Sequence, residues 1–216
     1  MNNLLYWLEM FGVVVLAISG GFQASIRRLD ITGFVLVAVV TGVGGGTLRD
    51  ILLYHGPVFW VREPLWLWLT ISVAVLVYFT APFVERRSAV LLWTDALGLA
   101  ALCVVGAQAG LDAGASASIA ILIGIMAALA GGVIRDVVCS ETPLIRRKEI
   151  YVEAAAAGAA VLVVANALDL PSPVAVFGGV AVSLAIRAGA LVFGLSLYRP
   201  AVPNQSGIVP RGKPRS

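Results

Sequence analysis

Two ionisable pairs stand inside apolar stretches of this sequence, and each pair follows a cluster of glycines. The two segments are Gly44-Gly45-Gly46-Thr47-Leu48-Arg49-Asp50 and Gly131-Gly132-Val133-Ile134-Arg135-Asp136. Arginine and aspartate within an apolar segment are costly unless they are paired or hydrated, so such residues are candidates for a solute or ion pathway. Glycine weakens a helix interior by about 1 kcal/mol relative to alanine and permits a kink or an exposed carbonyl.

The glycines and the charges each have two interpretations. Glycines at mid-span favour either a helix break that lines a water-filled cavity or close packing of two helices. The charges after both clusters favour the first interpretation, with the glycines as pore hinges and the charges lining or bracing the pore. The alternative for the charges is structural pairing. Neighbouring residues do not face each other on a helix, so Arg49 and Asp50 are expected to find separate partners.

A third intramembrane cation is Arg187, for which Asp136 is the first candidate partner. His55 is expected on a loop surface, and Cys103 and Cys139 are expected to be small packing residues. The sequence contains no pattern of a nucleophile with its base, a phosphate-binding loop or a cluster of metal ligands. We therefore predict no enzyme, no cofactor and no resident metal.

The composition of the 216 residues explains where these groups must lie: 60% are hydrophobic and 12% are charged, against roughly 25% charged in soluble domains. A membrane-crossing helix needs about 20 apolar residues. Seven stretches meet this requirement, at 4–26, 31–48, 64–84, 88–111, 113–134, 150–168 and 170–186. They are apolar on all sides, which excludes the alternation of a membrane β-barrel. The predicted class is an all-α polytopic membrane protein with seven transmembrane helices.

An internal repeat relates the first three spans to the next three. Residues 86 positions apart match at unusual types, namely Glu9 with Asp95, Gly12 with Gly98, Gly20 with Gly106, Pro57 with Pro143, Glu63 with Glu149 and the two glycine-Arg-Asp segments. A unit of three spans reverses the direction of its successor, so the repeats are inverted. The predicted organisation is 3+3+1: 1–87 and 88–169 as the two repeats, 170–198 as the seventh helix, and 199–216 as a disordered basic tail.

The basic residues set the predicted orientation. One face carries Arg27, Arg28, Arg86, Arg87, Arg146, Arg147, Lys148, Arg199, Arg211, Lys213 and Arg215, and the other carries Arg62. By the positive-inside rule the C-terminus is cytoplasmic and the N-terminus is outside. The partner that these charges imply is the lipid bilayer and not nucleic acid.

The charged pairs are expected to form two layers. They lie four or five residues beyond the glycines in helices of opposite direction, which displaces them by roughly 6–7 Å to either side of the glycine level. We therefore expect an hourglass path with a charged layer on each side of a glycine constriction.

With two glycine-Arg-Asp segments, each in the middle span of a three-span unit, the chain resembles the prokaryotic trimeric intracellular cation (TRIC) channel family. It also resembles the related bacterial two-repeat family of glycine transporters. The resemblance implies a homotrimer in the prokaryotic inner membrane, with a pore in each protomer between spans two and five, kinked at Gly44 to Gly46 and at Gly131-Gly132. The cargo that it implies is a monovalent cation, chiefly potassium, bound only transiently.

The predicted function is accordingly a passive potassium channel of the TRIC type. The alternative is a transporter of glycine-like small amino acids that uses the same inverted-repeat site. Each acid of the two Arg-Asp pairs has an adjacent arginine, which leaves no acid free for proton coupling and favours the channel.

Overall fold

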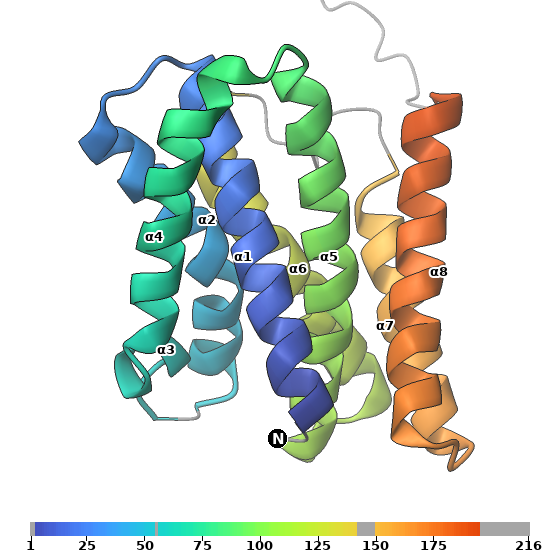
Figure 1. The fold of residues 1–216 in the computed structure, drawn as a ribbon. Helices are drawn as coiled ribbons and strands as arrows, with labels where there is room; N and C mark the ends of the chain where they lie inside the picture. The colour runs from blue at the N-terminus through green and yellow to red at the C-terminus, as the bar shows by residue number, and fades with distance from the viewer. Residues whose placement is uncertain (1–2, 55, 142–149, 195–216) are drawn as a thin grey trace, which may run out of the picture.

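The computed structural model describes residues 3–54, 56–141 and 150–194, and these residues fold into helices joined by short connections. The elements are α1 (Asn3–Ile26), α2 (Ile31–Leu52), α3 (Phe59–Arg62), α4 (Leu65–Thr80), η1 (Ala81–Phe83), α5 (Arg87–Asp112), α6 (Ala117–Val138), α7 (Val152–Ala167) and α8 (Ser172–Phe193). The helices form one bundle and run up and down along a common direction (Figure 1).

The all-α polytopic class is confirmed, since each of the seven expected spans corresponds to a helix. Six are long and apolar enough to cross a membrane, and α7 is a shorter apolar helix of 16 residues. Several helix ends differ from the expectation, and two of them have a clear physical reason. α6 begins at Ala117 because Gly114, with φ of +78°, turns the chain after α5. α2 continues through Arg49 and Asp50 because their charges are paired inside the bundle.

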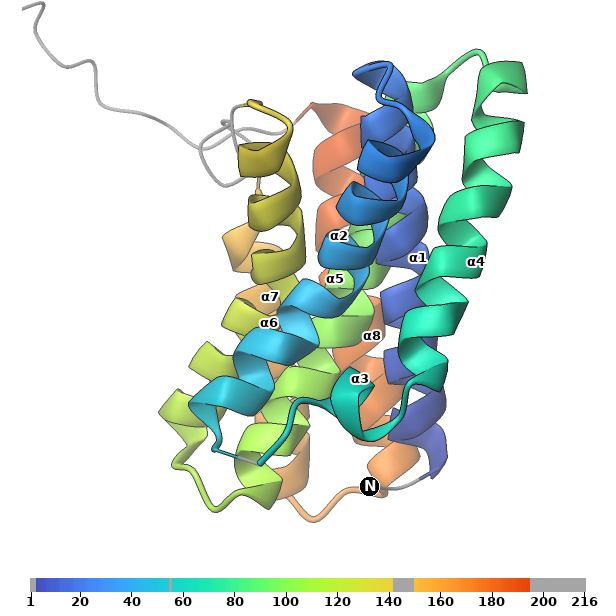
Figure 2. The ribbon, with the colours of Figure 1, turned by 90° about the vertical axis from the view of Figure 1, so that its left-hand side faces the viewer.

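The two repeats pack in corresponding ways. α1 packs against α2 and α4, and α5 packs against α6 and α7 in the same manner. The units meet along α1 with α5 and along α2 with α6. α2 and α6 run in opposite directions, as Figures 1 and 2 show. α8 lies outside this arrangement, against α7 and α5.

Contacts between the units are reciprocal, which is the signature of a pseudo-two-fold axis. A Cβ atom added at Gly12 would lie 2.8 Å from Leu102, and one added at Gly98 would lie 2.5 Å from Leu16. Leu16 and Leu102 are themselves 86 residues apart, so one contact is the symmetry copy of the other.

The central glycines bring the α2 and α6 backbones together. A Cβ atom added at Gly45 would collide with the carbonyl oxygen of Ala127, and one added at Gly131 would collide with that of Thr41. Both helices remain continuous through their glycines. The expected break at these positions is therefore wrong, because the missing side chains serve close packing of two intact helices. α2 still changes direction near its middle (Figure 2).

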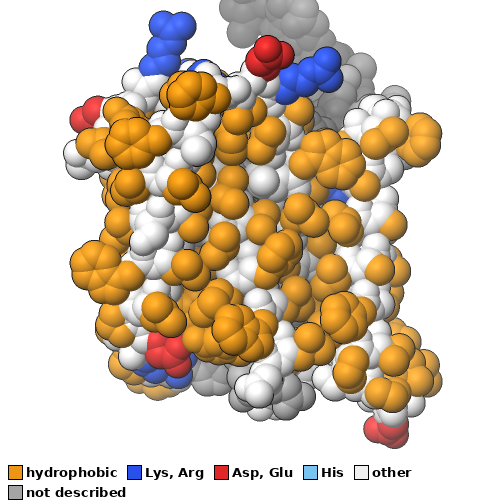
Figure 3. Space-filling model, in the orientation of Figure 1, with side chains coloured by type: hydrophobic (Ala, Val, Ile, Leu, Met, Phe, Trp, Pro, Cys, Tyr) orange, Lys and Arg blue, Asp and Glu red, His pale blue; other side chains and the backbone are white. Residues whose placement is uncertain are grey.

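The surface separates into an apolar side and two charged ends. Hydrophobic side chains cover the flank of the bundle, whereas the charged ones gather at the top and bottom (Figure 3). Large apolar residues such as Trp68, Leu76 and Phe79 are more than half exposed on α4. This distribution suits a helix bundle whose flank contacts lipid.

Candidate functional site

A buried charge cluster lies between α1 and the last turn of α2. Arg49 donates from Nη1 to Glu9 Oε1 at 2.6 Å, and from Nε and Nη2 to Asp50 Oδ1 at 2.9 and 2.7 Å. All three side chains are at least 94% buried. We name Glu9, Arg49 and Asp50 the first cluster.

Asp50 also fixes the chain that follows α2. Its Oδ2 atom accepts a hydrogen bond of 2.8 Å from the backbone N–H of Phe59, the first residue of α3. The half-exposed Arg62 lies 3.6 Å from the same oxygen. The first cluster therefore holds the short helix α3 over the end of α2.

The second cluster consists of Asp95, Arg135 and Asp136, each 86 residues after its counterpart. Arg135 donates from Nη1 to Asp95 Oδ1 at 2.7 Å and from Nε to Asp136 Oδ1 at 2.8 Å. The same Nη1 reaches Ser19 Oγ on α1 at 2.7 Å, a contact to the other repeat unit. The repeated sequence thus produces a repeated ion-pair geometry.

The expectation that adjacent Arg and Asp find separate partners is wrong in part. The guanidinium of Arg49 bridges its neighbour Asp50 and the more distant Glu9, and Arg135 does the same with Asp136 and Asp95. An arginine side chain is long enough to fold back along its own helix, and its fork of donors serves two carboxylates at once. Glu9 and Asp95 align in the repeat, but the sequence did not identify them as the partners of Arg49 and Arg135.

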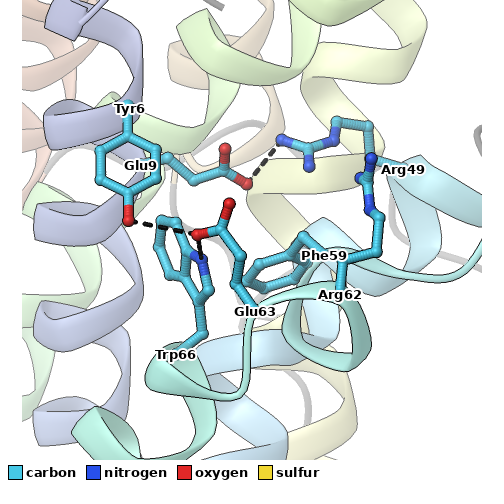
Figure 4. Close-up of a pocket in the computed structure, with 7 residues that line it drawn as sticks. All are labelled: Tyr6, Glu9, Arg49, Phe59, Arg62, Glu63 and Trp66. Atoms are coloured by element: carbon cyan, nitrogen blue, oxygen red, sulfur yellow. Dashed lines mark hydrogen bonds and ion pairs between the residues drawn. The ribbon is translucent and has the colours of Figure 1, made fainter.

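A cavity of about 230 Å³ opens onto the first cluster (Figure 4). Its lining residues are Tyr6, Glu9, Arg49, Phe59, Arg62, Glu63 and Trp66. The carboxylate of Glu63 lies between Tyr6 and Trp66 and accepts hydrogen bonds of 3.3 and 3.1 Å from their side chains. The cavity therefore presents two carboxylates, Glu9 and Glu63.

A smaller cavity of about 110 Å³ reaches the second cluster from the opposite end of the bundle. It is lined by Gln23, Ile26, Ser88, Leu91, Leu92, Arg135, Asp136 and Glu141. Glu141 pairs with Arg27 at 2.9 Å. Among the residues that line the two cavities, Tyr6 corresponds to Leu92 and Arg49 to Arg135 in the repeat.

Tightly packed side chains separate the two cavities. α1 contributes to both, with Glu9 in one and Gln23 in the other, and these residues lie about 21 Å apart along the helix. Between them Val13, Leu16 and Thr41 are fully or almost fully buried. The reciprocal contacts of Gly45 and Gly131 lie in this middle layer.

Arg187 of α8 lies in the half of the bundle that holds the second cluster. Its guanidinium stacks over the ring of Tyr151 at 4.9 Å, and Nη1 lies 3.4 Å from the carbonyl oxygen of Ile150. The pairing with Asp136 stays a prediction. Other expectations concern His55, Pro143, Glu149, the basic residues at 146–148 and the tail at 199–216, which lie outside the described residues.

The fold and the two clusters define a polytopic helical membrane protein built from inverted repeats around buried ion pairs. The family model described as "Glycine transporter" matches residues 6–82 and 92–167, which correspond closely to the two repeat units. The chain belongs to this family. The UPF0126 inner membrane protein YadS of Escherichia coli strain K12 is 38% identical over 90% of this chain and 95% of its own.

Solved structures of TRIC channels have the same fold. The TRIC channel orthologue from Rhodobacter sphaeroides matches with a TM-score of 0.88 and 42% identity, over 90% of this chain and all of the other. A prokaryotic TRIC channel crystallised in KCl matches with a TM-score of 0.86 and 27% identity, over 91% of this chain and all of the other. The resemblance to the TRIC family is confirmed. These solved relatives are channels and not enzymes, in line with the class predicted from the sequence.

Proposed function

We propose that this chain is a channel of the TRIC type that passes monovalent cations, chiefly potassium, by passive flux. The observation that carries the proposal is its likeness to the Rhodobacter sphaeroides TRIC channel, which at 42% identity spans the whole of that chain. In this proposal the protein is a homotrimer like the trimeric channels it resembles, with a separate pore in each protomer.

The two cavities are the proposed mouths of the pore. They approach the middle of the bundle from opposite ends, and each reaches one arginine of the repeated clusters. In the described conformation the middle layer is closed by the α2–α6 crossing at Gly45 and Gly131. Opening then requires these two helices to separate or slide at their glycine contact.

The charge of the clusters favours cations. Each cluster contains two carboxylates and one guanidinium, so each has a formal charge of −1 when all groups are ionised. Acidic side chains beside a pore attract cations and repel anions. The arginines hold the acids in position and prevent them from binding a passing ion too tightly.

The proposed location is the prokaryotic inner membrane, with the N-terminus outside and the C-terminus in the cytoplasm. The basic loops support this orientation through the positive-inside rule. An impermeant maleimide should label Asp169→Cys, but not Glu85→Cys, in intact cells, because these exposed positions lie at opposite ends of the bundle. Labelling of Glu85→Cys alone would reverse the orientation.

A second candidate, transport of a glycine-like amino acid, is favoured by the description of the family model. Planar-bilayer recording of the purified protein separates the two. Discrete potassium currents that reverse at the potassium equilibrium potential support the channel. Silent bilayers together with saturable glycine uptake into liposomes would replace the channel with the carrier.

A further inference from the structure

Two adjoining cavities lie at the end of the bundle where α1 leads into α2 and α4 leads into α5. Their volumes are about 640 and 440 Å³, and they share Ser25, Arg28, Pro82 and Arg87 in their walls. The connections that form them lie at one end of the bundle (Figure 1). The larger cavity shares Ile26 and Ser88 with the cavity that reaches the second cluster, but neither is lined by a residue of the two clusters. We name them together the loop pocket.

The charged half of the loop pocket holds Arg28, Arg86 and Arg87, with Glu85 as the acid in its lining. Within the described part of the chain, none of these arginines forms an ion pair. Neighbouring Arg27 differs, because it is paired with Glu141. The loop pocket therefore concentrates positive charge that the described residues do not neutralise.

Arg87 is held in a fixed position by neutral groups. It donates to the hydroxyl of Ser25 at 3.2 Å and to the carbonyl oxygens of Val84 and Pro82 at 3.3 and 3.2 Å. The N-terminus of α5, which has no side-chain cap, lies beside it. A preorganised guanidinium next to a helix N-terminus is a favourable arrangement for a phosphate group.

The other half of the loop pocket is apolar and faces the flank of the bundle. Its aromatic residues are Phe34, Tyr78, Phe79 and Phe83, and Phe34 packs edge-to-face on Tyr78 with ring centroids 5.3 Å apart. Phe79 and Phe83 are 62% and 86% exposed. Phe34 and Tyr78 lie within one turn of the helix ends, so the groove leads from the charged rim into the apolar layer.

The repeat shows that the scaffold alone does not require a charge at the position of Arg28, because the residue 86 positions later is Gly114. The positive-inside rule accounts for basic residues at this end, but it needs only charges in loops. It does not account for a hollow in which one arginine is anchored by three hydrogen bonds above an aromatic groove.

We propose that the loop pocket binds an anionic phospholipid of the adjacent leaflet. Its phosphate lies among Arg28, Arg86 and Arg87, and one acyl chain follows the aromatic groove. Basic pockets between transmembrane helices are suited to such headgroups. A free phosphate ion would leave the aromatic half unused. The proposal is independent of whether the protein conducts ions.

The test measures lipid retention by native mass spectrometry of the purified full chain in detergent, with added phosphatidylglycerol or phosphatidylcholine. We expect the unaltered protein to retain phosphatidylglycerol selectively. The double variant Arg28→Gln/Arg86→Gln should bind it about 30-fold more weakly, because each arginine near a headgroup contributes about fivefold. These two side chains make no described hydrogen bond, so the variant should fold.

Two further variants separate the lipid from simpler anions. Arg27→Gln removes the same charge from the same loop outside the loop pocket and should leave retention unchanged. Phe83→Ala, at an exposed position, should weaken phosphatidylglycerol binding severalfold. Equal retention of phosphatidylcholine, an unaffected double variant, an equal loss in Arg27→Gln, or complete displacement of the lipid by sodium phosphate would each overturn the proposal.

Discussion

The first and second clusters have the same ion pairs but different surroundings. Glu9 of the first cluster lines an open cavity together with Glu63, whereas Asp95 of the second is fully buried and lines neither cluster's cavity. The second cluster also has Ser19 as a partner of its arginine and lies in the half of the bundle that contains Arg187 and Tyr151. The repeat thus determines the pairing, whereas the surroundings differ: α3 lies over the first cluster, and α8, which is outside the repeats, contributes Arg187 beside Tyr151 in the half of the second cluster.

The largest effect should come from breaking the more buried pair. Arg135→Gln leaves Asp95 without its cation in a fully buried position, which is expected to lower the free energy of unfolding by about 3–5 kcal/mol. Arg49→Gln should cost less, because Glu9 lines the 230 Å³ cavity, where water can hydrate its carboxylate once the arginine is removed. Equilibrium unfolding in mixed micelles measures the loss of stability in both variants.

The compensating variant Arg135→Gln/Asp95→Asn serves as the control for that experiment. It removes the Asp95 charge along with that of Arg135 and should recover part of the lost stability, since Asp136 still lacks the guanidinium of Arg135. Equal losses for Arg49→Gln and Arg135→Gln would contradict the difference that we draw between the clusters.

Substitutions at the two central glycines should lower the stability by equal amounts, whereas substitutions in the two clusters should not. Gly45→Ala and Gly131→Ala each place a methyl group against a carbonyl oxygen of the opposite helix, so each is expected to cost about 1–3 kcal/mol, and by similar amounts. Gly189→Ala on α8, where the added methyl meets no atom within 4 Å, is the matched control. Unfolding midpoints in detergent report all three, and a large difference between the first two would argue against a reciprocal contact.

A smaller effect is expected at the mouth of the first cavity. Glu63→Gln should lower potassium conductance in dilute KCl by up to about fivefold, the result of losing an attraction of about 1 kcal/mol. The effect should shrink at about 1 M salt, where the screening length is about 3 Å. Single-channel recording measures it.

Asp169→Asn is the control for this experiment. It removes a charge from the same end of the bundle, in the α7–α8 connection, and its backbone φ of +53° suits asparagine. If both variants reduce conductance equally, the first cavity is not the mouth of the pore.

The smallest effect belongs to Arg62→Gln. Arg62 is half exposed and lies 3.6 Å from Asp50, which Arg49 and the Phe59 backbone already satisfy. Its loss should change the free energy of unfolding by less than about 1 kcal/mol. A loss comparable to that of Arg49→Gln, in the same unfolding assay, would mean that Arg62 is a full member of the first cluster.

The sequence predicted the seven spans from local composition and the inverted repeat from the spacing of a few unusual residue types. Long uncharged stretches indicate directly which segments cross the membrane. The repeat is recognised from Gly, Arg and Asp residues spaced 86 positions apart, because matches between apolar residues are uninformative in so hydrophobic a chain. The boundaries of the repeat units stay a prediction.

The function of the glycines and the partners of the arginines could not be predicted in the same way. Whether Gly45 breaks its helix or allows another helix to pack closely depends on which residue lies against it. That residue is Ala127, which is 82 positions away in the sequence, so local sequence does not reveal the contact. The Glu9–Arg49 pair depends on the rotation of two helices about their axes. Its only signal in the sequence was that Glu9 repeats as Asp95 at the spacing of the Arg-Asp pairs.

The reciprocal contact of Gly45 with Ala127 and of Gly131 with Thr41 has a consequence for the current–voltage behaviour of the proposed channel. A gate that coincides with a two-fold axis presents the same energy barrier to an ion from either side of the membrane. Any rectification of the current must then arise at the two cavities, whose charged residues differ. Exchanging the charges of the two cavities should therefore reverse the direction of rectification and leave the open probability of the channel unaltered.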